Sequence, residues 1–289
     1  MSSRPTLRVP EGTTVNLADH PTAPAGELAD EEAARESIER DTEALARYQD
    51  ILTAHGRYAV LVLFQGMDAA GKDETIQKVM SSVDPKGSRA ATFKELTETD
   101  LKHDYLRRYV EALPERGQIG IFNRSYYEQV ITDRVHPEKL EAQELPDEAC
   151  EPDIWRQRYR QINDFERYLV ENGIRVLKFF FHISKECQRQ RLLKRMSDPE
   201  LQWQFAASDM EDRDRWDSFM EYYGEMLSNT STEWAPWYLI PGDERWFEYA
   251  TVASIIVETM KSLHTDYPGT DPDTLEEIEE ARRKLEAEA

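Results

Sequence analysis

The sequence predicts an α/β protein in which helices cover both faces of a doubly wound parallel sheet of about five strands. Two apolar runs, at 58–64 and 175–183, are continuous rather than alternating, which is typical of strands buried on both faces. Segments with helical patterns alternate with such runs along the chain, and this order predicts right-handed βαβ crossovers. A glycine-rich turn follows the first run directly, where a strand would pass into a helix.

The expected elements follow one another from about residue 30 onward. The first helix carries charged residues on most of its faces. Pro114 is expected to end the helix at 100–113, and Gly173 is expected to end the helix at 154–172. The expected strands are 58–64, 89–94, 118–123, 175–183 and 237–240, and the expected helices are 30–54, 72–83, 100–113, 126–135, 154–172, 185–196, 203–227, 248–264 and 274–288.

The chain divides into three expected parts. Residues 1–27 are polar and contain several prolines, which is typical of an N-terminal arm. Residues 28–267 form one domain, since 289 residues suffice for a single large domain with a substantial core. Residues 268–289 form a charged C-terminal helix, packed on a partner or simply solvated.

The net charge of −21 restricts the partners of the protein, because such a surface repels nucleic acid and other polyanions on average. One stretch differs. Residues 155–195 contain eleven Lys and Arg and four Asp and Glu, a local excess of seven positive charges. We therefore expect no nucleic-acid partner, and place any polyanion site near this stretch.

Composition also predicts a cytoplasmic protein. No apolar run approaches the roughly 20 residues that a membrane-spanning helix needs, and the first 27 residues contain no hydrophobic signal core. Cys150 and Cys187 form no paired motif, so reduced thiols are expected. The six histidines do not stand at ligand spacing from a cysteine, so zinc is not expected.

Residues 66–72 match the G-x-x-x-x-G-K core of a phosphate-binding loop between a strand and a helix. Gly66 and Gly71 allow positive φ angles and a close backbone approach to phosphate oxygens. The amides of Ala69, Ala70 and the helix N-terminus would face the anion. Lys72 supplies a mobile charge for the terminal phosphates. The pattern predicts phosphoryl-transfer chemistry, with a structural glycine turn as the alternative.

The metal ligand of this loop departs from the usual pattern. The Ser or Thr that normally follows the lysine is Asp73, and a carboxylate, Asp68, stands inside the loop. Mg²⁺ prefers hard oxygen ligands and usually keeps several waters. We expect Asp68 to order Mg²⁺, with Mn²⁺ as a substitute. The alternative role for Asp68 is to stabilise the turn.

Three ordered blocks resemble the family-2 polyphosphate kinases: residues 66–73 (GMDAAGKD), 119–128 (IGIFNRSYYE) and 178–188 (KFFFHISKECQ). The resemblance runs from about residue 56 to about 242. It implies a thymidylate-kinase-like P-loop kinase fold with a helical lid at about 185–215. It also implies Mg²⁺-dependent phosphoryl transfer between inorganic polyphosphate and nucleotides. Relatives in this family are commonly dimers or tetramers, so a homo-oligomer is expected.

The second block resembles the Walker B region of the family, where many members carry Asp-Arg-Ser. This sequence has Asn123, Arg124 and Ser125, followed by Glu128. That pattern resembles the class III members, which accept nucleoside mono- and diphosphates. The resemblance places Arg124 at a phosphate and Asn123 and Glu128 near the acceptor nucleotide. Arg134 is a weaker candidate for the acceptor phosphate.

The third block leads into the lid, whose functional arginines match Arg191 and Arg195. Four residues apart, they share one face of a helix, and a guanidinium fork suits phosphate oxygens. The alternative is a solvated basic surface. Lys94 resembles a further phosphate-binding position. His103 is expected to be a structural histidine at least as much as a general base. Three aromatic residues, Trp203, Trp216 and Tyr222, are expected to pack in the core or lid rather than to contact a nucleotide base.

The function expected from residues and resemblance together is phosphoryl transfer from polyphosphate to AMP, ADP or both. The catalytic set is Asp68, Lys72, Arg124, Arg191 and Arg195. Two alternatives stay open: an ATP-dependent nucleoside or nucleotide kinase, and a P-loop protein that binds nucleotide as a regulator. Formation of ADP from AMP and polyphosphate in the absence of ATP would distinguish the polyphosphate-dependent kinase from both alternatives.

Overall fold

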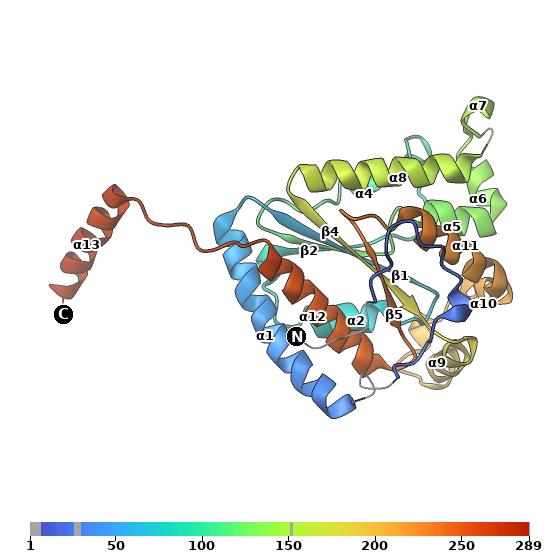
Figure 1. Ribbon diagram of the computed structural model, residues 1–289, viewed down its shortest axis with the longest axis horizontal. Coiled ribbons are helices and arrows are strands. Elements are labelled where there is room, and N and C mark those ends of the chain that lie inside the picture. The colour runs from blue at the N-terminus through green and yellow to red at the C-terminus, as the bar shows by residue number, and fades with distance from the viewer. Residues whose placement is uncertain (1–6, 26–29, 151–152, 289) are drawn as a thin grey trace.

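The computed structural model describes residues 7–25, 30–150 and 153–288; expectations for residues 1–6, 26–29, 151–152 and 289 lie outside these ranges. Five parallel strands form one sheet in the order β2-β3-β1-β4-β5 (Figure 1). They are β1 (Ala59–Gly66), β2 (Ser88–Thr92), β3 (Ile119–Asn123), β4 (Ile174–His182) and β5 (Trp237–Pro241). The predicted five-stranded parallel sheet is confirmed.

The position of each strand explains its sequence. All eight residues of β1 are buried, because it lies between β3 and β4 under helices on both faces. The edge strand β2 is partly exposed along its whole length. The register pairs Phe64 with Asn123 and Gly66 with Phe181, so the carboxyl ends of β1, β3 and β4 meet at one edge. Ligands of open α/β sheets bind at such an edge.

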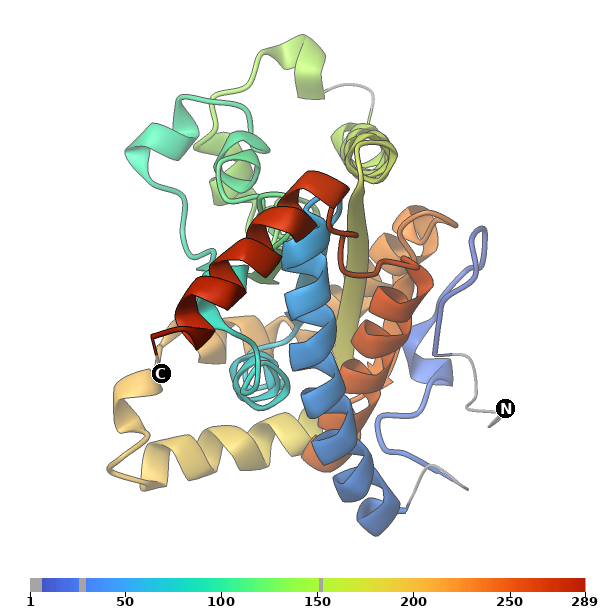
Figure 2. The same cartoon turned by 90° about the vertical axis from the view of Figure 1, so that its left-hand side faces the viewer.

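Helices cover the sheet in two layers, as a doubly wound fold requires (Figures 1 and 2). On one face lie α1 (Glu31–His55), α2 (Lys72–Val79) and α12 (Arg245–Ser262), with α1 against α12. On the other lie α5 (Glu128–Val135), α8 (Ile154–Glu171) and α11 (Trp216–Thr230). Asp30 caps α1 by accepting a hydrogen bond from the amide of Ala33. Among the described residues, none of these helices combines the length and apolar character needed to cross a bilayer.

Two expected helices are each divided. The segment 100–113 forms α3 (Glu98–Leu101) and α4 (Arg107–Val110). Thr97 and Asp100 make a reciprocal capping box that starts α3 early, and the Asp104 side chain accepts from the amide of Leu106 just before α4. The segment 203–227 forms η4 (Gln202–Gln204), α10 (Ser208–Asp214) and α11, with Arg215 outside helical geometry between the last two. The remaining short elements are η1 (Leu17–Asp19), η3 (Pro85–Gly87), α6 (Pro137–Glu141) and α7 (Asp147–Cys150). The helix α9 (Lys185–Ser197) stands at the start of the predicted lid.

The described part of the N-terminal arm, residues 7–25, packs on the domain. The amide of Val9 donates to Trp237 O at 2.8 Å and the amide of Leu239 donates to Leu7 O at 2.8 Å. The arm thus pairs antiparallel with β5 at the edge of the sheet. Its amide at Val15 donates to Ser228 Oγ at 2.8 Å, which ties the arm to α11 as well.

A fully buried ion pair joins β4 to α8 inside the core. Lys178 of β4 and Glu166 of α8 are fully buried, and Lys178 Nζ lies 2.6 Å from Glu166 Oε2. The hydroxyls of Tyr126 and Tyr127 each donate to Glu166 Oε1 at 2.8 Å, and Lys178 also donates to Thr230 O at 2.7 Å. Burial raises the pKa of Glu166 and lowers that of Lys178. Full hydrogen bonding is what makes such a buried pair tolerable.

Candidate active site

The predicted phosphate loop joins β1 to α2 at the carboxyl edge of the sheet. Gly66, Ala69 and Gly71 have φ angles of 149°, 60° and 112°. A Cβ on Gly66 would lie 2.8 Å from Phe181 O, and one on Gly71 would lie 1.1 Å from Arg245 Nη1. Both φ angles favour glycine, as expected for a loop that wraps an anion. At Gly66 the close atom belongs to the backbone, whereas at Gly71 the Arg245 guanidinium would have to move.

Lys72 turns back over the loop that precedes it. Its Nζ donates to Gly66 O at 2.7 Å and to Met67 O at 3.0 Å, and its side chain is buried. Burial and the neighbouring Arg124 charge lower its pKa. An anion in the loop would offer this ammonium a stronger partner than two neutral carbonyls.

Asp68 forms an ion pair with Arg124, which the end of β3 brings across the loop. Arg124 has a φ of 65°, and its amide donates to Phe64 O at 3.1 Å. Its guanidinium also lies 3.5 Å from Glu128 Oε2. Burial opposes ionisation of Asp68, but the charges of Arg124, Lys72 and Arg195 outweigh it, so its pKa lies below the usual value. Asp68 is thus a carboxylate at neutral pH.

The residue in place of the usual Ser or Thr also joins the site. Asn123 Nδ2, at the end of β3, donates to Asp73 Oδ1 at 2.6 Å. Glu128 accepts from Gln65 Nε2 at 3.1 Å and from Thr132 Oγ1 at 2.6 Å. The second sequence block therefore lies directly beside the loop.

Side chains from two other segments hold the carbonyls of the loop. Arg191 of α9 donates through Nη1 to Ala69 O at 3.1 Å and Ala70 O at 2.9 Å. Through Nη2 it donates to Gly242 O at 2.7 Å and Asp243 O at 3.1 Å. We call Gln188, Arg191 and Arg245 the carbonyl clamp, since Arg245 Nη1 also donates to Ala70 O at 2.8 Å and Gln188 Nε2 to Asp68 O at 3.1 Å.

The carbonyl clamp determines where the backbone oxygens of the phosphate loop point. The carbonyls of Asp68, Ala69 and Ala70 are all held by the clamp. The amide of Ala70, which was expected to face the anion, instead donates to Met67 O at 3.0 Å within the loop. Arg191, expected from the sequence to face the transferring phosphate, directs both terminal nitrogens at backbone oxygens. Behind the clamp, Glu248 is buried and accepts from Arg245 at 3.1 Å and Thr75 at 3.0 Å, and burial raises its pKa to about 7. The sequence analysis did not identify Gln188, Arg245 or Glu248 as site residues. The one signal in the sequence was Gly71, because a side chain there would meet Arg245 and Glu248.

Arg195 lies on α9, within the predicted lid, and pairs with an acidic residue of α10. Its Nη1 is 2.8 Å from Asp209 Oδ2. Burial, and then the charge of Asp68, raise the pKa of Asp209 to about 6. Nearby on α10, Asp212 lies 2.7 Å from His136 Nε2. These acidic partners were not predicted.

The other predicted residues lie in varied surroundings. Arg134 pairs with Glu225 and lies 3.9 Å from the centroid of the Tyr222 ring. Lys94 is exposed just beyond β2. His103 Nδ1 lies 2.8 Å from Thr99 O, a local structural contact. Of the three aromatic residues weighed earlier, Trp216 is buried, Tyr222 packs on Arg134, and Trp203 is 79% exposed.

The donor set fits a magnesium ion ordered by few protein ligands. Within the described residues, no three His, Cys, Asp or Glu side chains form a metal-binding group. Asp68 is ionised, and the Asp73 carboxylate and Asn123 amide lie close together. Mg²⁺ is commonly held by one or two carboxylates together with substrate phosphates and waters.

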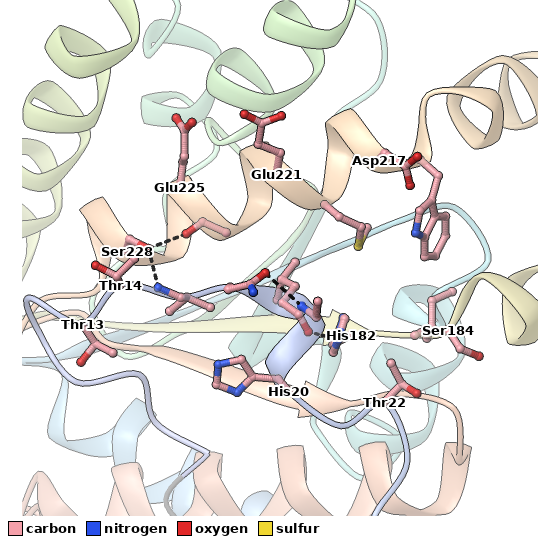
Figure 3. A pocket seen from close by; sticks show the side chains of 18 of the residues that line it. Thr13, Thr14, His20, Thr22, His182, Ser184, Asp217, Glu221, Glu225 and Ser228 are labelled. Carbon is pink, nitrogen blue, oxygen red and sulfur yellow. Dashed lines mark hydrogen bonds between the residues drawn. The ribbon is translucent and has the colours of Figure 1, made fainter.

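A cavity of about 880 Å³ lies elsewhere, between the N-terminal arm and α11 (Figure 3). Thr13 and His20 of the arm, Asp217 and Ser228 of α11 and His182 of β4 line it. None of its lining residues belongs to the phosphate loop or to the predicted site. The loop itself is therefore the candidate site, and it lies at the open carboxyl edge of the sheet.

Comparison with known proteins identifies relatives over nearly the whole chain. The family model described as Polyphosphate kinase 2 (PPK2) matches residues 28–268. An ADP-polyphosphate phosphotransferase of Rhodopseudomonas palustris is 43% identical over 280 residues, 96% of this chain and 97% of its own. An AMP/ADP-polyphosphate phosphotransferase of Meiothermus ruber is 43% identical over 85% of this chain and 87% of its own. The crystal structure of a polyphosphate kinase 2 from Arthrobacter aurescens TC1 superposes with a TM-score of 0.85 at 31% identity, covering 100% of this chain and 98% of that one.

Proposed function

Since the chain belongs to the polyphosphate kinase 2 family, we propose that it transfers a phosphoryl group between inorganic polyphosphate and a nucleotide. The acceptor is AMP, ADP or both, and the reaction is reversible. The relatives named for transfer to ADP and to AMP/ADP support this assignment. The observation that carries it is the phosphate loop with ionised Asp68 held against Arg124.

Such a reaction asks the protein for charge neutralisation and alignment. Both the attacking and the leaving group are phosphate oxygens, so no general base is needed. The loop amides and Lys72 bind the reacting phosphates, with Lys72 exchanging the carbonyls of Gly66 and Met67 for phosphate oxygens. Arg124 and Arg195 offset the charge of the transferring group, and Arg195 leaves Asp209 to do so.

Mg²⁺ is the proposed cofactor, with Mn²⁺ as a substitute. Asp68 would hold it, and the ion would neutralise phosphate oxygens of donor and acceptor. The amide of Asn123 orients the carboxylate of Asp73 beside it. Chelation of the divalent cation with EDTA is expected to abolish turnover.

The two substrates enter from different sides of the loop. Polyphosphate follows the basic lid and Lys94, whereas Asn123, Glu128 and Arg134 serve the acceptor nucleotide. We further propose that the protein acts in the cytoplasm as a homo-oligomer, a dimer or tetramer. The proposed location and the proposed oligomeric state do not affect the phosphoryl-transfer step itself.

A substrate panel tests the proposal. AMP, ADP, GMP and GDP are each incubated with polyphosphate and Mg²⁺ in the absence of ATP, and phosphorylated products are quantified. Products from AMP or ADP are expected, and Lys72→Ala and Asp68→Asn should each remove most of the activity. Product formation with ATP as donor but not with polyphosphate would instead establish an ATP-dependent kinase. Tight nucleotide binding without turnover from either donor would point to a regulatory P-loop protein.

A further inference from the structure

The C-terminal helix α13 (Pro272–Glu286) stands apart from the rest of the molecule. Figure 1 shows it projecting away from the domain at the end of an extended linker. None of its residues is buried. The side-chain hydrogen bonds and ion pairs found for residues 271–286 all lie within this segment.

One face of this helix is apolar. Leu275, Ile278 and Leu285 are 49%, 51% and 67% exposed, and their spacing of three and seven residues places them on a single stripe. A helix of 15 residues is marginally stable alone in water, and most helical stability comes from packing such a stripe. The geometry of α13 therefore calls for a partner surface.

The charges of α13 are separated along its length. Residues 272–280 contain five acidic side chains and no basic one, whereas residues 281–286 contain three basic side chains and one acidic. Two parallel copies in register would set the acidic halves against each other. In an antiparallel pair, with Leu275 of one copy opposite Leu285 of the other, each acidic half faces a basic half.

We propose that α13 pairs antiparallel with α13 of a second copy of this chain, about a two-fold axis. Such an interface is isologous, so one self-complementary patch serves both copies. The apolar stripes meet at its centre, and the two charge-matched halves fix the direction. The linker before α13 leaves the helix free to reach across, while the Tyr267 hydroxyl donates to Asp50 Oδ2 at 2.6 Å and ties the linker to α1.

Charge-reversal variants test this pairing. In the first variant Glu276, Glu277, Glu279 and Glu280 are each replaced by Lys; in the second Arg282→Glu, Arg283→Glu and Lys284→Glu are combined. Sedimentation velocity should show that the mass of the wild-type assembly falls by a factor of two in each variant alone. An equimolar mixture of the two variants should regain the full mass. Phosphoryl transfer serves as a control and should stay unchanged, since α13 contributes no residue to the loop.

Cysteine cross-linking tests the direction of the pair. In a Cys150→Ser, Cys187→Ser background, Leu275→Cys and Leu285→Cys chains should form disulfides when mixed and not separately. Cross-linking of either variant with itself would indicate a parallel pair and overturn the proposal. Unchanged assembly in both charge variants, or a mixture that fails to regain mass, would also overturn it. Each outcome is independent of whether polyphosphate is the substrate.

Discussion

Replacing Arg191 by lysine should damage catalysis through the backbone of the phosphate loop. The guanidinium donates four hydrogen bonds, two to the loop at Ala69 and Ala70 and two to the turn at Gly242 and Asp243. A lysine carries one ammonium and cannot span both segments. Arg191→Lys therefore keeps the charge but releases one side of the clamp.

The expected loss follows from the bonds that lysine cannot make. A hydrogen bond from a charged donor contributes about 1.5–3 kcal/mol, and two of the four are lost. Because the ammonium regains part of this, we expect roughly 2–4 kcal/mol less transition-state stabilisation. At about 1.4 kcal/mol per decade, kcat/KM should fall roughly 30- to 1,000-fold.

The assay measures kcat/KM for polyphosphate at saturating nucleotide, with thermal unfolding as a check on folding. Arg189→Lys is the matched control, since Arg189 lies on the same helix but is exposed and pairs with Glu186; it should be unchanged. Arg245→Lys shares the acceptor Ala70 O, so the double variant with Arg191→Lys should lose less than the sum of the single losses. A change under about threefold for Arg191→Lys, or strict additivity with Arg245→Lys, would refute the clamp.

Three further outcomes follow from other contacts. Gly71→Ala should lower kcat/KM at least about tenfold, because the new Cβ would lie 1.1 Å from Arg245 Nη1 at a φ of 112°; near-normal kinetics would contradict this. Glu166→Gln should lower the melting temperature by roughly 6–20 °C in calorimetry, since an unpaired buried Lys178 costs about 3–5 kcal/mol; a drop under about 2 °C would be evidence against it. Glu248 has its pKa raised from 4.5 to about 7, so the folded protein binds an extra proton between these values. The contribution of Glu248 to stability should therefore fall by roughly 3 kcal/mol as the pH rises from about 5 to 8, and urea unfolding of Glu248→Gln should lack this part of the pH dependence.

Local signals made most of the sheet and the phosphate loop predictable. The continuous apolar runs of β1 and β4 reflect burial on both faces, and the strand-to-helix context of Gly66 and Lys72 located the loop. The early start of α3 also had a local sign in the sequence, the capping box of Thr97 and Asp100.

Contacts between distant segments were not predictable in the same way. The break at Arg215 separates α11 from α10, whose Asp209 pairs with Arg195 of α9, and residue spacing does not encode that pairing. Arg191 was identified as a site residue, but the direction of its guanidinium depends on backbone carbonyls of the phosphate loop and of the turn at Gly242 and Asp243. Arg245 carries no motif and joins the site only because β5 brings the start of α12 to the loop.

The docking of the N-terminal arm on β5 also bears on how the chain is made. Ser231 Oγ donates to Val9 O at 2.5 Å, so the arm depends on residues synthesised more than 200 positions later. At about 5–20 residues per second, the arm waits at least about ten seconds until Ser231 has been synthesised. The arm therefore docks late. Until it does, the outer edge of β5 lacks its partner strand and can pair with another nascent chain.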